Sequence, residues 1–132
     1  MKILVCGGRD YKDKDAMFRT LYNLCDLCYC WGVPHEDGNN LPTNIKIISG
    51  MARGADQLAI DWAIVNWTQF KGYPADWKVN GKAAGPIRNQ QMLDQEKPHL
   101  IVAFPGGRGT ADMVNRAKAQ GYNVMEIVSE HK

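Results

Sequence analysis

Residues 100–110 read LIVAFPGGRGT, an apolar run that passes directly into a glycine-rich turn. The run from Leu100 to Phe104 predicts a β-strand, and the residues after the turn predict a helix from about Thr110 to Gln120. Gly121 lies just past that helix, where glycine commonly ends one. The stretch therefore predicts a strand–turn–helix unit, the building block of an α/β fold.

The same order of strand, small-residue turn and helix recurs along the chain. The run Lys2–Cys6 is continuously rather than alternately apolar, as expected for a central strand that helices cover on both faces. The other expected elements are strands at Ile45–Ile48, Thr68–Tyr73 and Asn123–Val128, helices at Asp15–Cys30, Leu58–Val65 and Ala84–Gln95, and a surface loop at Trp31–Asn44. Because crossovers between parallel strands are right-handed, we predict a doubly wound three-layer α/β sandwich with a five-stranded parallel sheet in the order 3-2-1-4-5.

Length and charge limit the number of domains and the kinds of partner that the chain is expected to have. The 132 residues suit a single domain over residues 1–132. A net charge of +2 gives no strong field, so nucleic acid is a less expected partner. No apolar run is long enough to cross a bilayer, and the N-terminus leads from Lys2 into a short strand and Gly7 rather than through a signal peptide. We expect a cytoplasmic protein without a membrane partner.

The four cysteines do not form the dispersed pattern of a disulfide framework. Cys25, Cys28 and Cys30 crowd into one predicted helix, and Cys6 lies in the first strand. A reducing compartment fits this arrangement. The Cys-x-x-Cys spacing resembles half of a zinc site, and His35 is nearby, but a second ligand pair at suitable spacing is missing. We therefore expect structural thiols, no metal site and no cofactor.

Three glycine-bearing turns, at residues 7–10, 50–55 and 105–110, each follow a predicted strand and precede a helix. In an open parallel sheet, ligands bind at the edge where the strands end. Glycine lets the backbone approach a ligand, and the N–H groups at a helix N-terminus favour phosphate. Each turn alone is as well explained as a tight turn, but three at one edge favour a phosphate site.

Two familiar nucleotide motifs are missing from these turns. The chain has neither the Gly-x-Gly-x-x-Gly fingerprint nor a Walker-type Gly-Lys-Ser/Thr. The absence of both motifs therefore argues against hydride transfer with NAD and against P-loop ATP hydrolysis as the function.

Side chains near the three turns supply the matching chemistry. Arginine presents a planar fork of donors to phosphate, and aspartate can accept from ribose hydroxyls or cap a helix. For Asp56 and Asp112 we expect the structural role. Trp77 and Tyr11 are expected near the ligand and able to stack on a base, whereas Trp62 and Trp67 are expected in the core. The predicted ligand-binding residues are Gly7, Gly8, Arg9, Asp10, Gly50, Arg53, Gly54, Asp76, Trp77, Arg88, Pro105, Gly106, Gly107, Arg108, Gly109 and Thr110.

Five ordered motifs resemble the SLOG superfamily, and more narrowly its small single-domain branch related to bacterial YspA, which is common in bacteria and phages. They span nearly the whole chain: VCGGRDY at 5–11, SGMARGAD at 49–56, ADW at 75–77, GKAAGPIRN at 81–89 and FPGGRGTADM at 104–113. The resemblance implies a Rossmann-like nucleotide-binding fold, shared with the Lonely Guy phosphoribohydrolases and the DNA-processing Smf proteins. It also adds Lys82 and Asn89 to the expected ligand-binding residues.

The hydrolases of this superfamily carry Arg-Lys-x-x-Met ahead of a Pro-Gly-Gly-x-Gly-Thr-x-x-Glu loop, whose arginine and glutamate act on an N-glycosidic bond. Here Arg88-Asn89-x-x-Met92 is similar to the first element. The position of the glutamate is Met113, which cannot transfer a proton. Asp112 is adjacent but turned by about 100° along a helix. Arg88 and Asp112 remain the candidates for catalysis.

Three functions stay open on the sequence. The first is a sensing or sequestering domain for a phosphate-bearing nucleotide derivative, for example an ADP-ribose-like molecule. The second is an N-glycosidic phosphoribohydrolase acting on nucleotides. The third is a single-stranded nucleic-acid module, for which a basic groove with aromatic platforms is expected. A homodimer is expected by analogy with the Lonely Guy enzymes.

Overall fold

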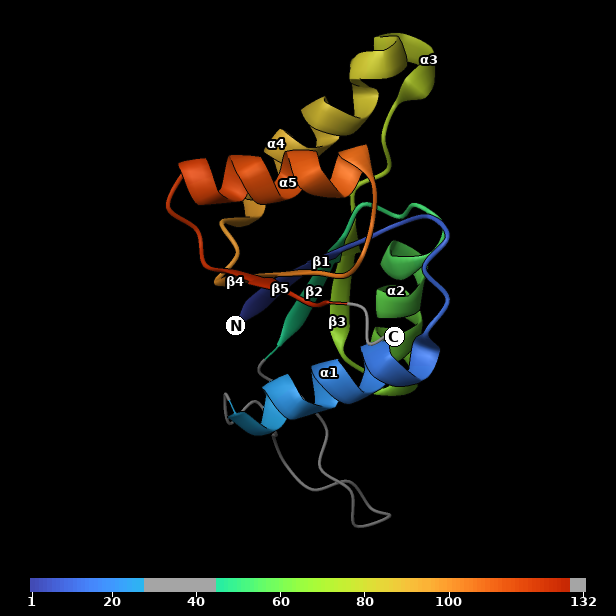
Figure 1. Cartoon of the computed structure of the whole chain (residues 1–132), viewed down its shortest axis with the longest axis vertical. Helices are drawn as coiled ribbons and strands as arrows, with labels where there is room; N and C mark the ends of the chain where they lie inside the picture. The colour runs from blue at the N-terminus through green and yellow to red at the C-terminus, as the bar shows by residue number, and fades with distance from the viewer. Residues whose placement is uncertain (28–44, 129–132) are drawn as a thin grey trace.

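The computed structural model describes residues 1–27 and 45–128, and its strands form one parallel five-stranded sheet in the order β3-β2-β1-β4-β5 (Figure 1). The α/β class and the strand order predicted from the sequence are confirmed. The elements are β1 (Lys2–Cys6), α1 (Lys14–Leu27), β2 (Lys46–Ser49), α2 (Ala55–Val65), β3 (Gln69–Gly72), α3 (Trp77–Asn80), the 3-10 turn η1 (Gly81–Ala83), α4 (Ala84–Glu96), β4 (Leu100–Ala103), α5 (Arg108–Ala119) and β5 (Val124–Glu126).

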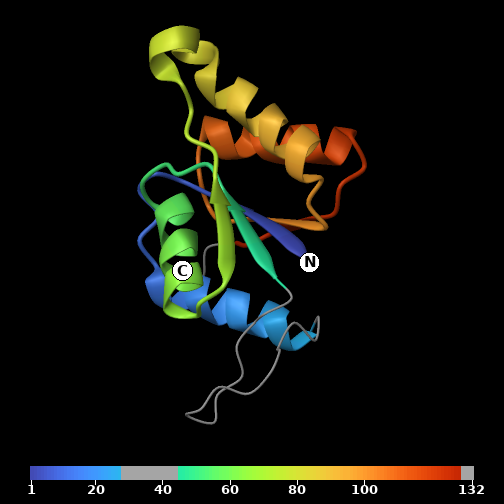
Figure 2. The ribbon, with the colours of Figure 1, turned by 180° about the vertical axis from the view of Figure 1, so that it is seen from behind.

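Helices cover both faces of the sheet, with α1 and α2 on one side and α4 and α5 on the other (Figures 1 and 2). Side chains of β1 alternate between the two layers. Ile3 and Val5 pack with α1 and α2, whereas Leu4 and Cys6 pack with α4 and α5. Because both faces are buried, the strand needs an apolar residue at each position. This is the physical origin of the continuous apolar run at the N-terminus.

The strand register brings three strand ends to one edge of the sheet. Val5 pairs with Ser49 of β2 and with Val102 of β4, so β1, β2 and β4 finish side by side. The three glycine-bearing turns leave from these ends. The order of the strands changes direction at β1 and β4, which is the place where open α/β sheets bind ligands.

Two predicted segments extend outside the described residues. The first helix was expected to run to Cys30, and α1 is described as far as Leu27. Cys28, Cys30 and the expected loop at Trp31–Asn44 lie beyond the described part of the chain. Cys25, the remaining member of the cysteine cluster, belongs to α1 and is fully buried on the side of that helix that faces the core.

The connection after β3 contains helical turns that the sequence pattern did not reveal. The short helix α3 is followed by η1 and then directly by α4. Asp76 caps α3 by accepting a hydrogen bond from the Val79 amide at 3.1 Å. Asp76 is therefore a helix cap in the structure. A four-residue helix is too short to show a 3.6-residue apolar period, which is why the pattern gave no signal.

The two tryptophans that the sequence places in the core, Trp62 and Trp67, differ in burial. Trp62 is fully buried in α2, as expected. Trp67 is 78% exposed, and its assignment to the core was wrong. Helix α2 ends at Val65, and Trp67 adopts a φ of 54° in the turn before β3. This turn carries Trp67 off the helix face that Trp62 occupies.

Among the described residues, no helix has both the length and the apolar character needed to cross a membrane.

Candidate functional site

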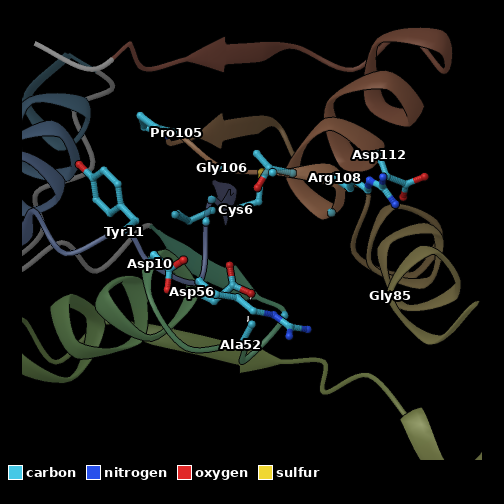
Figure 3. A pocket seen from close by; sticks show the side chains of 18 of the residues that line it. Cys6, Asp10, Tyr11, Ala52, Asp56, Gly85, Pro105, Gly106, Arg108 and Asp112 are labelled. Atoms are coloured by element: carbon cyan, nitrogen blue, oxygen red, sulfur yellow. Dashed lines mark hydrogen bonds between the residues drawn. The ribbon is translucent and has the colours of Figure 1, made fainter. Parts of the chain in front are cut away.

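The three glycine-bearing turns meet at a single residue, Gly8. The Gly8 amide donates to the Pro105 carbonyl at 2.9 Å, and the Gly8 carbonyl accepts from the Ala55 amide at 3.1 Å. The turn after β1 is thus hydrogen-bonded to the turns after β2 and β4. Figure 3 shows residues of all three turns around the same space.

The glycines of these turns serve two different needs. A Cβ atom at Gly54, where φ is 82°, would lie 2.2 Å from the Gly8 carbonyl oxygen, and one at Gly106 would lie 2.6 Å from the Gly8 nitrogen. These glycines allow the turns to touch. At Gly107 and Gly109 a Cβ would meet nothing within 4 Å among the described residues. Their bare backbone faces open space, which close packing of the turns does not explain.

That space is a cleft of about 1540 Å³ at the carboxyl edge of the sheet. Most of the sequence-predicted ligand-binding residues line it: Gly7, Gly8, Arg9, Asp10, Gly50, Trp77, Lys82, Arg88, Asn89, Pro105, Gly106, Gly107, Arg108, Gly109 and Thr110. Arg53, Gly54 and Asp76 do not. The exposed Arg53 guanidinium lies 3.6 Å from the exposed Asp10 carboxylate, Gly54 packs against Gly8, and Asp76 caps α3.

The N-terminus of α5 opens onto this cleft. The helix begins at Arg108, two residues earlier than predicted, and its N-cap residue Gly107 provides no side-chain hydrogen bond. The Ala111 amide donates to the Gly107 carbonyl at 3.0 Å, so the amides of residues 108–110 precede the first intrahelical bond. These N–H groups carry the positive end of the helix dipole. The arrangement is suited to an anionic oxygen.

A second helix start lies beside the first. Helix α4 begins after Ala83, which also supplies no side-chain cap bond, and Gly85 and Pro86 of its first turn line the cleft. By contrast, the short α3 is capped by its own aspartate. Because α4 follows η1 directly, the Ala84 amide already donates to the Gly81 carbonyl. The first turns of two long helices therefore border the same space, and the start of α5 is the one that begins without a preceding helical turn.

Arg88 lines the cleft and is half-buried near the ends of β2 and β3. Its Nη1 donates to the Gly50 carbonyl at 2.6 Å and to the Tyr73 carbonyl at 3.4 Å, and its Nε donates to Asn89 Oδ1 at 3.1 Å. Burial lowers the pKa of the Arg88 guanidinium, and the nearby Asp56 carboxylate opposes that shift. The guanidinium is thus held in a fixed position by backbone oxygens. It presents a positive charge to whatever occupies the cleft.

Asp56 lies next to this arginine and is only 6% exposed. Its Oδ2 accepts from the Ala52 amide at 3.2 Å, and the Ser49 hydroxyl donates to its backbone carbonyl at 3.0 Å. These bonds tie the turn after β2 to the start of α2, in agreement with the expected structural role. Asp56 also lines the cleft. Burial raises the pKa of its carboxyl to about 6, although the Ala52 amide and the Arg88 and Arg9 guanidiniums act in the opposite direction.

An exposed wall of the cleft is formed by a cation and an aromatic ring. The Arg9 guanidinium carbon lies 5.5 Å from the centroid of the Trp77 ring. Trp77 is 48% exposed, so part of its ring surface stays open to the cleft. Lys82 lines the cleft close by in sequence, in η1. Positive charge and an aromatic surface therefore occur together on this side.

The Asp112 carboxylate takes part in a hydrogen-bond network between α4 and α5. It accepts from Arg116 Nε at 2.9 Å and from Asn89 Nδ2 at 3.0 Å. Asn89 Nδ2 also donates to the Gly109 carbonyl at 3.1 Å, which fixes the first turn of α5 against α4. Met113 is fully buried in the core. The position of the hydrolase glutamate thus faces the core in this chain, not the cleft.

Several cleft residues were not predicted from the sequence. They come mainly from the polar face of α1, from the end of β5 and from the first turns of α4: Cys6, Lys12, Asp13, Ala16, Arg19, Thr20, Ala52, Gly85, Pro86, Met92, Ile127 and Val128. The amphipathic pattern of α1 identifies its buried face only. Nothing local indicates that its opposite face borders a cleft rather than bulk solvent.

No protein-family model matches the chain. The chain is similar to the Gene 61 protein of Mycobacterium phage D29, with 29% identity over 133 residues. The alignment covers 96% of this chain and 95% of the phage protein. The two proteins therefore correspond over nearly their full lengths.

Proposed function

We propose that the chain binds a phosphate-bearing nucleotide or nucleotide derivative in the cleft, as a sensing or sequestering domain. The observation that carries this proposal is the start of α5. There, bare glycine backbone, amides that precede the first helical bond and the Arg108 side chain border one large cleft. Backbone N–H groups at a helix N-terminus are a general phosphate-binding device.

Side chains around this point support a nucleotide rather than phosphate alone. Arg88 and Arg9 add positive charge, and the exposed part of the Trp77 ring offers a surface on which a base can stack. The resemblance of the chain to the SLOG superfamily favours the same ligand class.

Calorimetry with AMP, GMP, CMP and UMP at low salt tests the proposal. The variant Arg108→Ala should weaken binding by about 10- to 100-fold, because a charge-assisted bond to phosphate contributes roughly 1.5–3 kcal/mol. Lys118→Ala removes a positive charge from the far end of the same helix, where Lys118 pairs with Glu126, and serves as the matched control. The proposal would be refuted if none of the four nucleotides bound, or if both variants and the parent protein bound with equal affinity.

N-glycosidic hydrolysis is the second candidate function, and Asp56 is the observation that favours it. A general acid is most effective when its pKa lies near the working pH, and this cleft carboxyl has a pKa of about 6. Release of free base from the four nucleoside monophosphates, measured at high protein concentration, tests the reaction. Activity that survives unchanged in Asp56→Asn would exclude Asp56 as the acid, and no base release from any nucleotide would remove this candidate.

A further inference from the structure

Asn89 lines the cleft, but both N–H groups of its side chain are hydrogen-bonded within the protein. The residue is 4% exposed, and its Nδ2 donates to the Gly109 carbonyl at 3.1 Å and to the Asp112 carboxylate at 3.0 Å. A side-chain amide has two N–H donors, so these bonds use both of them. A phosphate oxygen is an acceptor and needs a donor. Asn89 therefore has no donor left for a phosphate in the cleft.

The oxygen of the same amide holds Arg88. Asn89 Oδ1 accepts from Arg88 Nε at 3.1 Å. The Nη1 group of Arg88 donates to the Gly50 and Tyr73 carbonyls, which leaves Nη2 as its remaining donor group. Gly50 allows this arrangement, because a Cβ there would lie 2.4 Å from Arg88 Nη1. The guanidinium is thus held by protein oxygens and keeps one donor group for an anion.

The first turn of α5 is tied to α4 through Asn89. Residues 106–109 are exposed, and the first buried residue of α5 is Met113. The bond from Asn89 to the Gly109 carbonyl lies within this exposed turn. The same turn carries the amides of residues 108–110, which precede the first helical bond. The position of these amides relative to Arg88 is therefore set through Asn89.

We propose that Asn89 is a positioning residue for anion binding. It does not contact the phosphate, but it sets the spacing between Arg88 Nη2 and the amides at the start of α5, so that both donate to one anionic group. A single side chain must accept from Arg88 and donate to Gly109 for this purpose, which an amide can do and a lysine, a donor only, cannot. This inference rests on the proposed nucleotide-binding function and assigns a role within its site.

Calorimetry with AMP, GMP, CMP and UMP compares Asn89→Leu with the parent. Leucine has about the size of asparagine but no polar atom in its side chain, so it removes the ties to Arg88 and to Gly109. The nucleotide that binds the parent most tightly should bind the variant about tenfold or more weakly, because misplaced donors stabilise an anion less.

Asn66→Leu is the matched control. The Asn66 amide also forms two side-chain bonds, accepting from the Tyr22 hydroxyl at 3.0 Å and donating to the Trp62 carbonyl at 2.9 Å. Asn66 follows the last residue of α2 and does not line the cleft. This variant should keep the parent affinity, whatever the change in its unfolding free energy.

A double-mutant cycle separates positioning from direct contact. Arg88→Lys keeps a positive charge but has no Nε–H group to donate to Asn89. In the Arg88→Lys protein, Asn89→Leu should weaken binding further by about threefold or less, because only the tie to Gly109 remains to be lost. Urea unfolding shows whether each variant folds. If Asn89→Leu does not fold, Asn89→Ala, which adds no bulk, takes its place with the same expectations.

Three results would overturn the inference while nucleotide binding stands. The first is an affinity that Asn89→Leu leaves unchanged. The second is an equal loss of affinity from Asn89→Leu in the parent and in the Arg88→Lys protein, which would mean that Asn89 acts independently of Arg88. The third is an equal loss in Asn66→Leu, which would indicate general destabilisation. No binding of any of the four nucleotides to the parent would instead overturn the proposed function itself.

Discussion

Gly54 and Gly109 show that glycines of one binding edge can have opposite requirements. Replacing Gly54 by alanine should cost at least ~2 kcal/mol of unfolding free energy, because its φ is positive and a Cβ would collide with the Gly8 carbonyl. Gly109→Ala, in the first turn of α5, should leave stability unchanged or raise it slightly. It should nevertheless weaken nucleotide binding, because the methyl group enters the proposed phosphate site. Urea unfolding and calorimetry measure the two effects, and equal stability losses would contradict this division.

Asp56 predicts a distinct dependence of stability on pH. Its pKa is about 6 in the folded state and about 3.8 in the reference state, so between these values the folded protein binds more protons than the unfolded chain. The contribution of Asp56 to stability is therefore greatest below about pH 4, falls as the pH rises to 6 and stays low above that. The full change is at most ~3 kcal/mol.

The measurement is the difference in unfolding free energy between Asp56→Asn and the parent from pH 4 to 7. Asparagine retains an oxygen that can accept from the Ala52 amide but does not ionise. The variant should gain stability relative to the parent as the pH rises through this window, and should level off above pH 6. A constant difference across the window would contradict a raised pKa. Taking the difference cancels the contribution of other carboxyls, such as Glu96. Burial raises the pKa of Glu96, but its bonds to Tyr73 and to lysines together outweigh burial and lower it.

At the level of elements, the end of α2 separates two tryptophans that look alike in the sequence. Trp62→Ala should cost about 3–5 kcal/mol, because the ring is fully buried against the sheet. Trp67→Ala should change the unfolding free energy by less than about 1 kcal/mol, since most of that side chain is exposed. Chemical denaturation of both variants checks the contrast, which comparable losses would refute.

The elements also show where sequence patterns carry information. The strands β1, β2 and β4 were predicted well, because each is a short, mostly buried apolar run that is bounded by turns. The edge strand β3 carries Gln69 and Lys71 and is largely exposed, so its sequence pattern is weaker. The first turn of α5 was missed by two residues, since Arg108 and Gly109 look like loop residues until the N-cap at Gly107 is seen. Helix α3 was missed because four residues hold too little of a helical period.

At the scale of the whole molecule, binding and folding should be linked. A ligand present at 100 times its dissociation constant stabilises the native state by about 2.7 kcal/mol, which corresponds to a Tm increase on the order of 10 °C for a domain of this size. Thermal unfolding with and without the tightest nucleotide measures this shift. Arg108→Ala should show a smaller shift at the same ligand concentration, and an unchanged shift would indicate binding away from the start of α5.

The sequence predicted the sheet order and one side of the cleft, and the reasons are physical. Strand order follows from alternating elements and right-handed crossovers, and the turns at the carboxyl edge follow from glycine positions. The α1 side was not predictable, because Ala16, Arg19 and Thr20 lie on a polar helix face that solvent would explain equally well. Only the packing of α1 against the same edge of the sheet makes that face part of the cleft.

The backbone of Gly8, whose N–H donates to Pro105 and whose carbonyl accepts from Ala55, has a practical consequence for protein engineering. A designer who transplants the PGGRGT turn alone onto another α/β scaffold leaves behind the donor that orients its first carbonyl. The smallest transferable module is a set of three chain segments: residues 105–110 together with 7–8 and 54–55. Libraries that randomise one segment with the other two fixed should consequently yield few functional clones, and joint randomisation should recover compatible combinations.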